Sequence, residues 1–242
     1  MSAITVSGVA KRYGDLPVLS DLSFTVPEGA VFGLLGPNGA GKTTTINLLT
    51  GVAEPDAGHI DVLGRSPVDD PLGVRETVGV LPEKEAPPSF LTPREYFAFV
   101  AGVRELDRET VADRVTEWAD RLGFADKLDT LNKDLSRGQQ QKVMLVQAFL
   151  HDPDLVFIDE PLANLDPLVQ DAVKEFIVAY HDAGNTVVLS THHLAVADDL
   201  CTAVGILHDG RLARTYRPAS EETLHDAFRA AVAEPAPGRP TR

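Results

Sequence analysis

The residues best suited to do chemistry lie in a glycine-rich stretch, residues 36–44. Its spacing is G-x-x-x-x-G-K-[ST], and its members are Gly36, Pro37, Asn38, Gly39, Ala40, Gly41, Lys42, Thr43 and Thr44. The glycines let consecutive N–H groups turn toward a phosphate, and the positive end of a following helix reinforces them. Lys42 would add charge on the outer phosphates, and Thr43 would add a hydroxyl ligand for magnesium. An apolar run at 30–35 precedes the stretch and a helix start at 45–49 follows it, which favours a nucleotide site over a chance glycine-rich turn.

Two carboxylates, Asp159 and Glu160, end the apolar run 155–158. Successive side chains of a strand point to opposite faces, so the pair can divide two tasks. Asp159 would hold magnesium, directly or through water, and Glu160 would face an attacking water. Two acids that merely end a strand at solvent are the alternative. The apolar run before them and the glycine-rich stretch upstream favour the catalytic interpretation.

Three other positions could touch a ligand but also have an ordinary structural explanation. His192 follows a buried run at 186–190 and could reach a terminal phosphate, whereas His193 is expected on an exposed loop. Tyr13 lies on a loop before the glycine-rich stretch, where it could stack on adenine or cover the edge of a sheet. Glu83 follows another apolar strand, and it could touch a metal or a water or be a solvated loop glutamate.

The start of a helix near residue 136 combines a cap with a possible anion site. Ser136 and Gln139 stand at the spacing of a capping box, in which each satisfies a backbone N–H of the other. Gly138 lies in the first turn, where unpaired N–H groups and the helix dipole favour an anion. Capping alone explains the pattern equally well, so these residues leave both interpretations open.

Apolar runs separated by turn residues predict the strands that position these side chains. The predicted strands are 4–6, 22–26, 30–35, 59–63, 78–81, 155–160, 186–190 and 203–208, with a hairpin return at 211–212. Residues 11–17 are expected to form the turn between the first two. A helical insertion begins after residue 85, because Pro93 suits a first helical position and 106–122 is charged and amphipathic. Its apolar stripe should be buried, at Val111, Val115, Trp118 and Leu122.

Composition narrows the class of protein. At 242 residues with 43% hydrophobic content, the chain can bury a full core. One cysteine, Cys201, excludes an internal disulfide, and no run approaches the roughly 20 apolar residues of a membrane helix. No signal peptide is evident, so we expect a cytoplasmic protein. A net charge of −14 argues against binding nucleic acid, which depends on clusters of lysine and arginine.

The acidity also suggests a saline cell interior. The chain has 7 lysines, 15 arginines and 36 acidic residues. Molar salt screens charges over about 3 Å, which makes such a surface tolerable. An ordinary acidic cytosolic protein is the alternative.

Taken in order, these residues resemble the ATP-binding subunit of an ABC transporter over nearly the whole chain, from Tyr13 to about Arg211. The resemblance implies an α/β fold, with a P-loop ATPase core of mixed or parallel sheet flanked by helices. It also implies an N-terminal antiparallel β subdomain and an inserted helical subdomain. Residues 36–44 would be the Walker A loop, 136–139 the ABC signature, and Tyr13 the adenine-stacking aromatic.

The resemblance also assigns the chemistry of ATP hydrolysis with Mg²⁺. Asp159 would be the Walker B aspartate, Glu160 the general base and His192 the switch histidine, with Lys42 on the phosphates. The segment from Asn164 to Asp166 would be the D-loop, with Asp166 near the nucleotide, and Glu83 would stand in the Q-loop as a further metal contact.

The signature implies a second ATP-binding subunit, a copy or a paralogue, whose ATP Ser136 and Gly138 would touch. Two residues depart from the usual pattern: Arg137 replaces the first glycine of the signature, and Glu83 replaces the Q-loop glutamine. Both features are similar to the ABC-2-type exporter group. We expect a subunit that powers a separate membrane permease and lies on the inner face of the cell membrane.

The expected ABC ATPase domain covers residues 1–216, with its helical insertion at about 85–145. A short helix and a disordered tail rich in proline and alanine are expected over 217–242. Two rival functions remain. One is a soluble single-cassette ABC ATPase in cluster assembly, and the other is a regulatory module that binds ATP without hydrolysing it.

Overall fold

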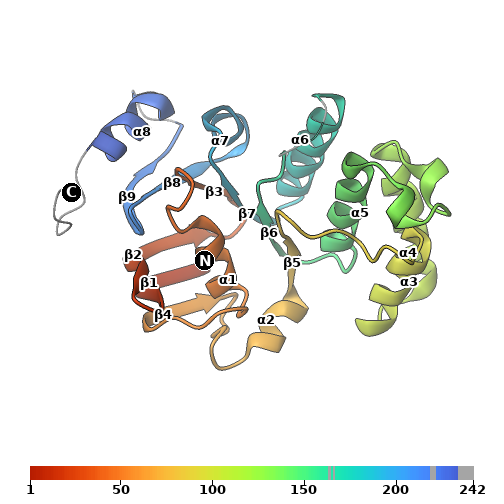
Figure 1. The fold of residues 1–242 in the computed structure, drawn as a ribbon, viewed down its shortest axis with the longest axis horizontal. Helices are drawn as coiled ribbons and strands as arrows, with labels where there is room; N and C mark the ends of the chain where they lie inside the picture. Colours follow the sequence, from red (N-terminus) through yellow and green to blue (C-terminus); the bar gives the residue numbers. More distant parts are fainter. Residues whose placement is uncertain (163–164, 166, 219–221, 234–242) are drawn as a thin grey trace.

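A computed structural model of the chain describes residues 1–162, 165, 167–218 and 222–233, which form two β-sheets flanked by helices (Figure 1). The smaller sheet has the order β2-β1-β4 and consists of β1 (Ser2–Tyr13), β2 (Leu16–Pro27) and β4 (Ala57–Val62). The larger has the order β5-β6-β7-β3-β8-β9 and consists of β3 (Val31–Leu35), β5 (Val78–Leu81), β6 (Leu155–Asp159), β7 (Thr186–Thr191), β8 (Ala203–His208) and β9 (Arg211–Tyr216). The α-helices are α1 (Lys42–Leu49), α2 (Pro71–Thr77), α3 (Pro93–Val103), α4 (Arg108–Arg121), α5 (Arg137–Phe149), α6 (Pro167–Asp182), α7 (Leu194–Leu200) and α8 (Leu224–Ala233).

The smaller sheet is antiparallel throughout, as the resemblance implied. The predicted turn at 11–17 is wrong, because β1 and β2 continue to a tight turn at Gly14 and Asp15 alone. Lys11 pairs with Leu19 within the ladder. The end of β1 is exposed at Arg12 and Tyr13, where polar residues fit an extended strand as well as a turn. Tyr13 therefore ends a strand instead of lying on a loop.

The larger sheet is parallel from β5 to β8, and β9 is added antiparallel to β8. Every residue of β3, β6 and β7 is buried, which explains why these strands read as continuous apolar runs. β7 lies between β6 and β3, with Asp159 opposite Ser190 and Leu35 opposite Thr191. The carboxyl ends of three strands far apart in sequence therefore meet at one edge of the sheet.

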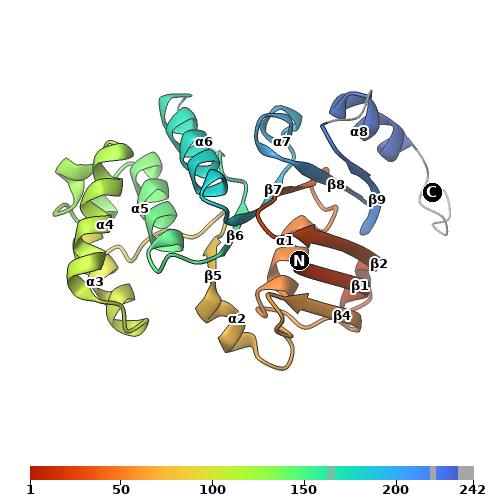
Figure 2. The same cartoon turned by 180° about the vertical axis from the view of Figure 1, so that it is seen from behind.

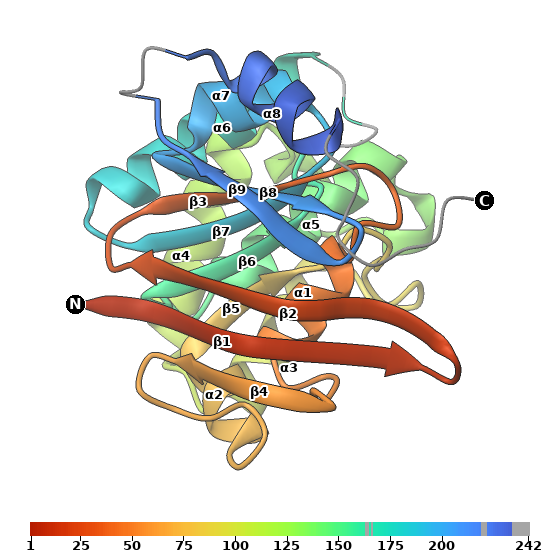
Figure 3. The same ribbon diagram turned by 90° about the vertical axis from the view of Figure 1, so that its left-hand side faces the viewer.

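Helix α1 is packed between the two sheets, as Figure 3 shows. Its Ile46, Leu48 and Leu49 are buried, and Phe24 of β2 stacks on Phe32 of β3 with ring centroids 5.4 Å apart. On the opposite face of the larger sheet lie α6 and α7 (Figure 3). The start of α1, where the glycine-rich stretch ends, is thereby fixed from both sides.

Helices α3, α4 and α5 gather at one end of the molecule (Figure 2). Thr92 and Glu95 cap α3 with a capping box, and Pro93 occupies the first turn as predicted. The predicted stripe of α4 is buried at Val111, Val115 and Leu122. Trp118 is partly buried, and it packs on Phe149 and Phe176 with centroids 5.7 and 4.7 Å away. This aromatic cluster joins α4 to α5 and α6.

The short helices α2 and α7 are absent from the sequence-based prediction. Each of these helices has seven residues, which are too few for the apolar residues to show a helical period. The strand after α7 is preceded by Cys201, whose burial raises the pKa of its thiol to about 12. A Cβ added at Gly33 of β3 would lie 2.7 Å from the Cys201 sulfur, so this thiol fills the gap left by a glycine. No helix in the described part of the chain is long and apolar enough to cross a membrane.

Candidate functional site

The glycine-rich stretch connects the end of β3 to the start of α1 as a tight loop. A Cβ at Gly36 would lie 2.4 Å from the Leu207 carbonyl oxygen, so no side chain fits there. Gly41 has φ +106°, a left-handed conformation that favours glycine. The loop therefore passes close to β8 and turns its backbone toward the opening in front of α1, where the first N–H groups of a helix lack intrahelical acceptors.

Lys42 is buried at the base of this loop, with 7% of its surface exposed. Its Nζ donates to the carbonyl oxygens of Gly36 at 2.9 Å and Pro37 at 3.4 Å. The Glu160 Oε1 atom lies 3.9 Å from the same nitrogen. A buried ammonium requires polar or anionic partners, and these carbonyls hold it beside the loop, where it can meet an incoming phosphate.

Asp159, the last residue of β6, accepts two hydroxyl hydrogen bonds. The Thr43 Oγ1 atom donates to Oδ2 at 2.8 Å, and the Ser190 hydroxyl donates to Oδ1. A threonine hydroxyl and a carboxylate side by side are oxygen ligands of the kind that Mg²⁺ prefers. Of the three residues predicted to hold a metal, Thr43 and Asp159 are therefore in direct contact, and Glu83 lines the cavity that opens in front of them.

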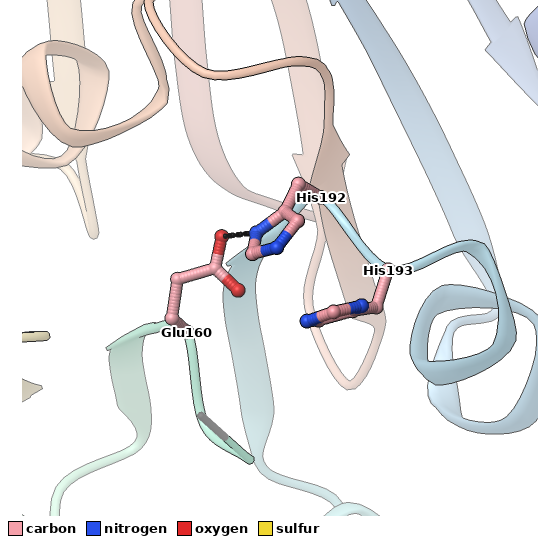
Figure 4. Close-up of side chains that lie close together, drawn as sticks. All are labelled: Glu160, His192 and His193. Carbon is pink, nitrogen blue, oxygen red and sulfur yellow. Dashed lines mark hydrogen bonds and ion pairs between the residues drawn. The ribbon is translucent and has the colours of Figure 1, made fainter. Parts of the chain in front are cut away.

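Glu160 lies just beyond β6 and not within it. Its φ is +54°, a left-handed conformation that is uncommon for a non-glycine residue and that clusters at functional sites. Its side chain is buried, and Oε2 accepts a hydrogen bond from the Thr191 hydroxyl at 3.1 Å. Oε1 lies 2.7 Å from Nδ1 of His192, a contact drawn as a dashed line in Figure 4. The two tasks expected of the acid pair are thus separated by a backbone turn, and not by the alternation of a strand.

A cavity of about 410 Å³ opens in front of these groups, within the size range of small-molecule sites. Its lining residues are Leu16, Val18, Asn38, Gly39, Gly41, Lys42, Thr43, Thr44, Glu83, Asp159, Glu160 and His192. Most residues that the sequence singled out therefore meet in one place. The loop N–H groups, the lysine and the oxygen-ligand pair suit a nucleoside triphosphate with its metal.

Several predicted site residues lie apart from this cavity. Tyr13 is 49% exposed, and Nζ of Lys11 stands 5.5 Å from the centroid of its ring. At the start of α5, Ser136 and Gln139 form the predicted capping box, each bonding the backbone N–H of the other. Gly138 follows in the same turn. Asp166 and its neighbour Asn164 lie outside the described residues.

Two hydroxyl residues at the end of β7, Ser190 and Thr191, belong to the site although the sequence did not single them out. Ser190 donates to Asp159, and Thr191 donates to Glu160. The Thr191 hydroxyl also accepts a hydrogen bond from the His193 N–H at 3.0 Å. Hydroxyl residues at the carboxyl end of a buried strand were the available signal, because that edge of a parallel sheet is where ligands bind.

Comparisons with known proteins identify the family of this chain. Residues 19–163 match the family model described as ABC transporter. The chain is 36% identical over 221 residues to a Nod factor export ATP-binding protein I of Rhizobium etli, covering 90% of this chain and 69% of that protein. It is 34% identical over 210 residues to the daunorubicin/doxorubicin resistance ATP-binding protein DrrA of Streptomyces peucetius, covering 87% and 64%.

A solved structure described as the ATP-binding subunit of an ABC transporter superposes with a TM-score of 0.88 at 31% identity. It covers 95% of this chain and 99% of its own. The agreement therefore extends over the core, the smaller sheet and the helical group together. The chain belongs to the ABC transporter family and has the fold of its nucleotide-binding domain.

Proposed function

We propose that this chain binds ATP with Mg²⁺ and hydrolyses it to power a separate membrane permease. The observation that carries the proposal is the contact of 2.7 Å between Glu160 and His192, beside a buried lysine at the base of the phosphate loop. A carboxylate oriented by a histidine next to a triphosphate site suits a general base for an attacking water.

Each residue then has a separate task. The loop N–H groups and Lys42 bind the phosphates, and His192 holds the terminal phosphate in place. Thr43 and Asp159, with Glu83 nearby, would hold Mg²⁺, which neutralises charge on the phosphates when bound. Glu160 accepts the proton of the attacking water, and the Thr191 hydroxyl keeps its carboxylate oriented.

A second ATP-binding subunit completes the site. Ser136 and Gly138 lie at the start of α5, away from the cavity that contains Lys42. In our proposal they contact the ATP held by a second copy of this chain or a paralogue, where the α5 dipole and its N–H groups favour a phosphate. The two nucleotides are then enclosed between the two subunits.

The permease would dock between the larger sheet and the helical group formed by α3, α4 and α5. A second cavity, of about 590 Å³, adjoins the first and is lined in part by Val52, Glu83, Tyr96 and Arg104. Val52 is 64% exposed and Phe90, on the segment before α3, is 76% exposed; in our proposal both contact the permease. Glu83 lines both cavities. In our proposal it therefore couples changes at the bound nucleotide to the permease.

Export is the direction that the relatives favour. One is named for Nod factor export and another for resistance to daunorubicin and doxorubicin. We infer that this chain serves an exporter and lies at the cytoplasmic face of the membrane through its permease. Copurification with a membrane protein encoded beside its gene would support this role, and ATP turnover in a complex without any membrane protein would favour the soluble alternative.

The Glu160→Gln variant tests the mechanism. We expect its ATPase rate to fall by about 10²–10⁴-fold, the usual contribution of a general base. Because ATP still binds and is not consumed, gel filtration with MgATP should show a stable dimer. Glu175→Gln, at an exposed position of α6, is the matched control and should behave as wild type. A Glu160→Gln chain that turns over ATP normally, or that stays monomeric with ATP, would contradict the proposal.

A further inference from the structure

Three side chains where β6 and β7 end have the composition of a transition-metal site. Glu160, His192 and His193 each place a ligand atom within 4.8 Å of the others, and Figure 4 shows the three side chains gathered together. Over the described ranges no other group of three histidine, cysteine or acidic residues does so. We propose that these residues bind one zinc-class divalent ion when no nucleotide is present, and that this ion blocks hydrolysis.

The ligand set selects the class of ion. Two imidazole nitrogens and one carboxylate oxygen suit Zn²⁺ or Cu²⁺, and a fourth position remains for water. Mg²⁺ and Ca²⁺ prefer a ligand set made only of oxygen atoms. The hydroxyl of Thr43 and the carboxylate of Asp159 therefore suit these ions better. The chain thus offers two adjacent sites of different chemistry, one for a hard ion and one for a borderline ion.

The geometry requires only small side-chain movements. With bonds of about 2.0–2.2 Å, tetrahedral zinc ligands lie about 3.3 Å apart. The Glu160 oxygen and the His192 nitrogen, now 2.7 Å apart, must separate slightly. The ring of His193 already lies against that of His192, with centroids 3.9 Å apart. His193 is exposed, so rotation of its side chain can bring its nitrogen to the ion.

Thr191 forms hydrogen bonds with two of the three proposed ligand residues, Glu160 and His193. Its hydroxyl donates to Glu160 Oε2 at 3.1 Å and accepts from the His193 N–H at 3.0 Å. A hydrogen bond to a ligating carboxylate, such as the one to Glu160, orients the ligand and raises the affinity for the metal. One threonine therefore fixes the carboxylate and the backbone of one histidine relative to each other.

The local charge allows a divalent cation. Lys42 opposes it, because its Nζ lies 3.9 Å from Glu160 Oε1. The lining of the cavity contains the carboxylates of Glu83, Asp159 and Glu160 against the single lysine Lys42, so acidic groups outnumber basic ones there. Lys42 also donates hydrogen bonds to the loop carbonyls of Gly36 and Pro37, which stabilise its charge.

The inhibitory consequence depends on the proposed function, whereas the binding site does not. A metal-bound Glu160 cannot accept a proton, and a metal-bound His192 cannot hold a terminal phosphate. ATP would have to displace the ion before the site could close. Zinc-class ions and ATP should therefore compete for the same side chains.

Direct binding to the untagged, nucleotide-free chain tests the site. Calorimetric titration with ZnCl₂ should give one ion per chain, and Co²⁺ should develop the visible absorption of a tetrahedral site. His193→Ala should weaken Zn²⁺ binding at least about tenfold, the scale of losing a supporting contact at a metal. His225→Ala removes an exposed histidine of α8 and should leave binding unchanged. Absent binding, an unaffected His193→Ala chain, or an equal loss in His225→Ala would overturn the site.

Inhibition is measured separately, as ATPase activity at buffered Zn²⁺ concentrations with Mg²⁺ in excess. Without Zn²⁺ the His193→Ala chain should turn over ATP like wild type, and it should need at least about tenfold more Zn²⁺ for half inhibition. Zinc binding in a chain with no ATPase activity under any condition would support the site and remove the proposed function. Normal ATPase activity without zinc binding would remove the site alone.

Discussion

At the scale of single residues, the site depends on hydroxyl groups as much as on charges. Thr43, Ser190 and Thr191 donate to the two carboxylates that end β6 or follow it. Hydrogen bonds to an ionised acid are among the strongest in proteins. Asp159 and Glu160 therefore keep separate orientations although they are neighbours in sequence.

His151 should make the stability of the chain depend on pH. Burial, with the nearby positive charge of Arg104, lowers the pKa of its imidazole from 6.5 to about 4. Arg114 acts in the same direction, whereas Asp152 and the hydrogen bond to the Val78 carbonyl act against it. Between these two values the unfolded chain binds a proton that the folded chain does not. The free energy of unfolding should therefore decrease as the pH falls from 6.5 toward 4.

Urea unfolding at about pH 7.5 and about pH 5 measures this decrease, because the proton balance sets the slope of stability with pH. The His151→Gln variant can still donate to the Val78 carbonyl, and it should lose less stability over this interval than wild type. His225→Gln, on exposed α8, should keep the wild-type loss. Equal losses in wild type and His151→Gln would rule out His151 as the source.

At the scale of elements, two helices with the same cap have different tasks. Thr92 and Ser136 each begin a helix with a complete capping box. Only Ser136 lies in the segment that we propose contacts the partner's ATP. The cap geometry is therefore shared, and the function is not.

Replacing each cap residue by alanine separates stability from function. Ser136→Ala and Thr92→Ala should each lower the free energy of unfolding by about 0.5–2 kcal/mol. Only Ser136→Ala should weaken the ATP-dependent dimer in the Glu160→Gln background, as measured by gel filtration. If both variants weakened the dimer equally, the loss would reflect helix stability, and Ser136 would have no separate role.

Elements with a strong local signal could be predicted from the sequence, whereas contacts between distant strands could not. Residues 36–44 and their flanking strand and helix follow from local spacing. The contact between Glu160 and His192 depends on β7 lying between β6 and β3 in the larger sheet. The order of strands in a sheet cannot be predicted from any local sequence pattern. The extent of β1 was missed because the polar residues Lys11 and Arg12 come shortly before Gly14 and Asp15, which are typical of a turn.

The molecule as a whole carries an excess of acidic residues, and this has a consequence in salt. The chain carries a net charge of −14, and many of its ion pairs are exposed, such as Arg94 with Asp129. Exposed pairs contribute little, so repulsion between the remaining acids dominates at low ionic strength. Screening this repulsion should stabilise the fold.

Thermal unfolding in KCl tests whether the protein is adapted to a saline cell. We expect the unfolding temperature to keep rising as KCl approaches about 1 M, where charges are screened beyond about 3 Å. ATPase activity should be retained there. Sucrose at matched osmolality is the control for general exclusion from the surface. Full stability and activity at low salt, with inhibition by molar KCl, would contradict the adaptation.

The thiol packed against Gly33 also bears on how conformational changes of this protein can be followed with labels attached to cysteine. Cys201 is the sole cysteine of the chain, it is buried, and its raised pKa keeps it in the unreactive thiol form at neutral pH. A maleimide or spin label will therefore react with an engineered surface cysteine and leave the native one untouched. Labels at exposed positions of α4 and α8 could follow the helical group and the core through each turnover without any prior removal of cysteine.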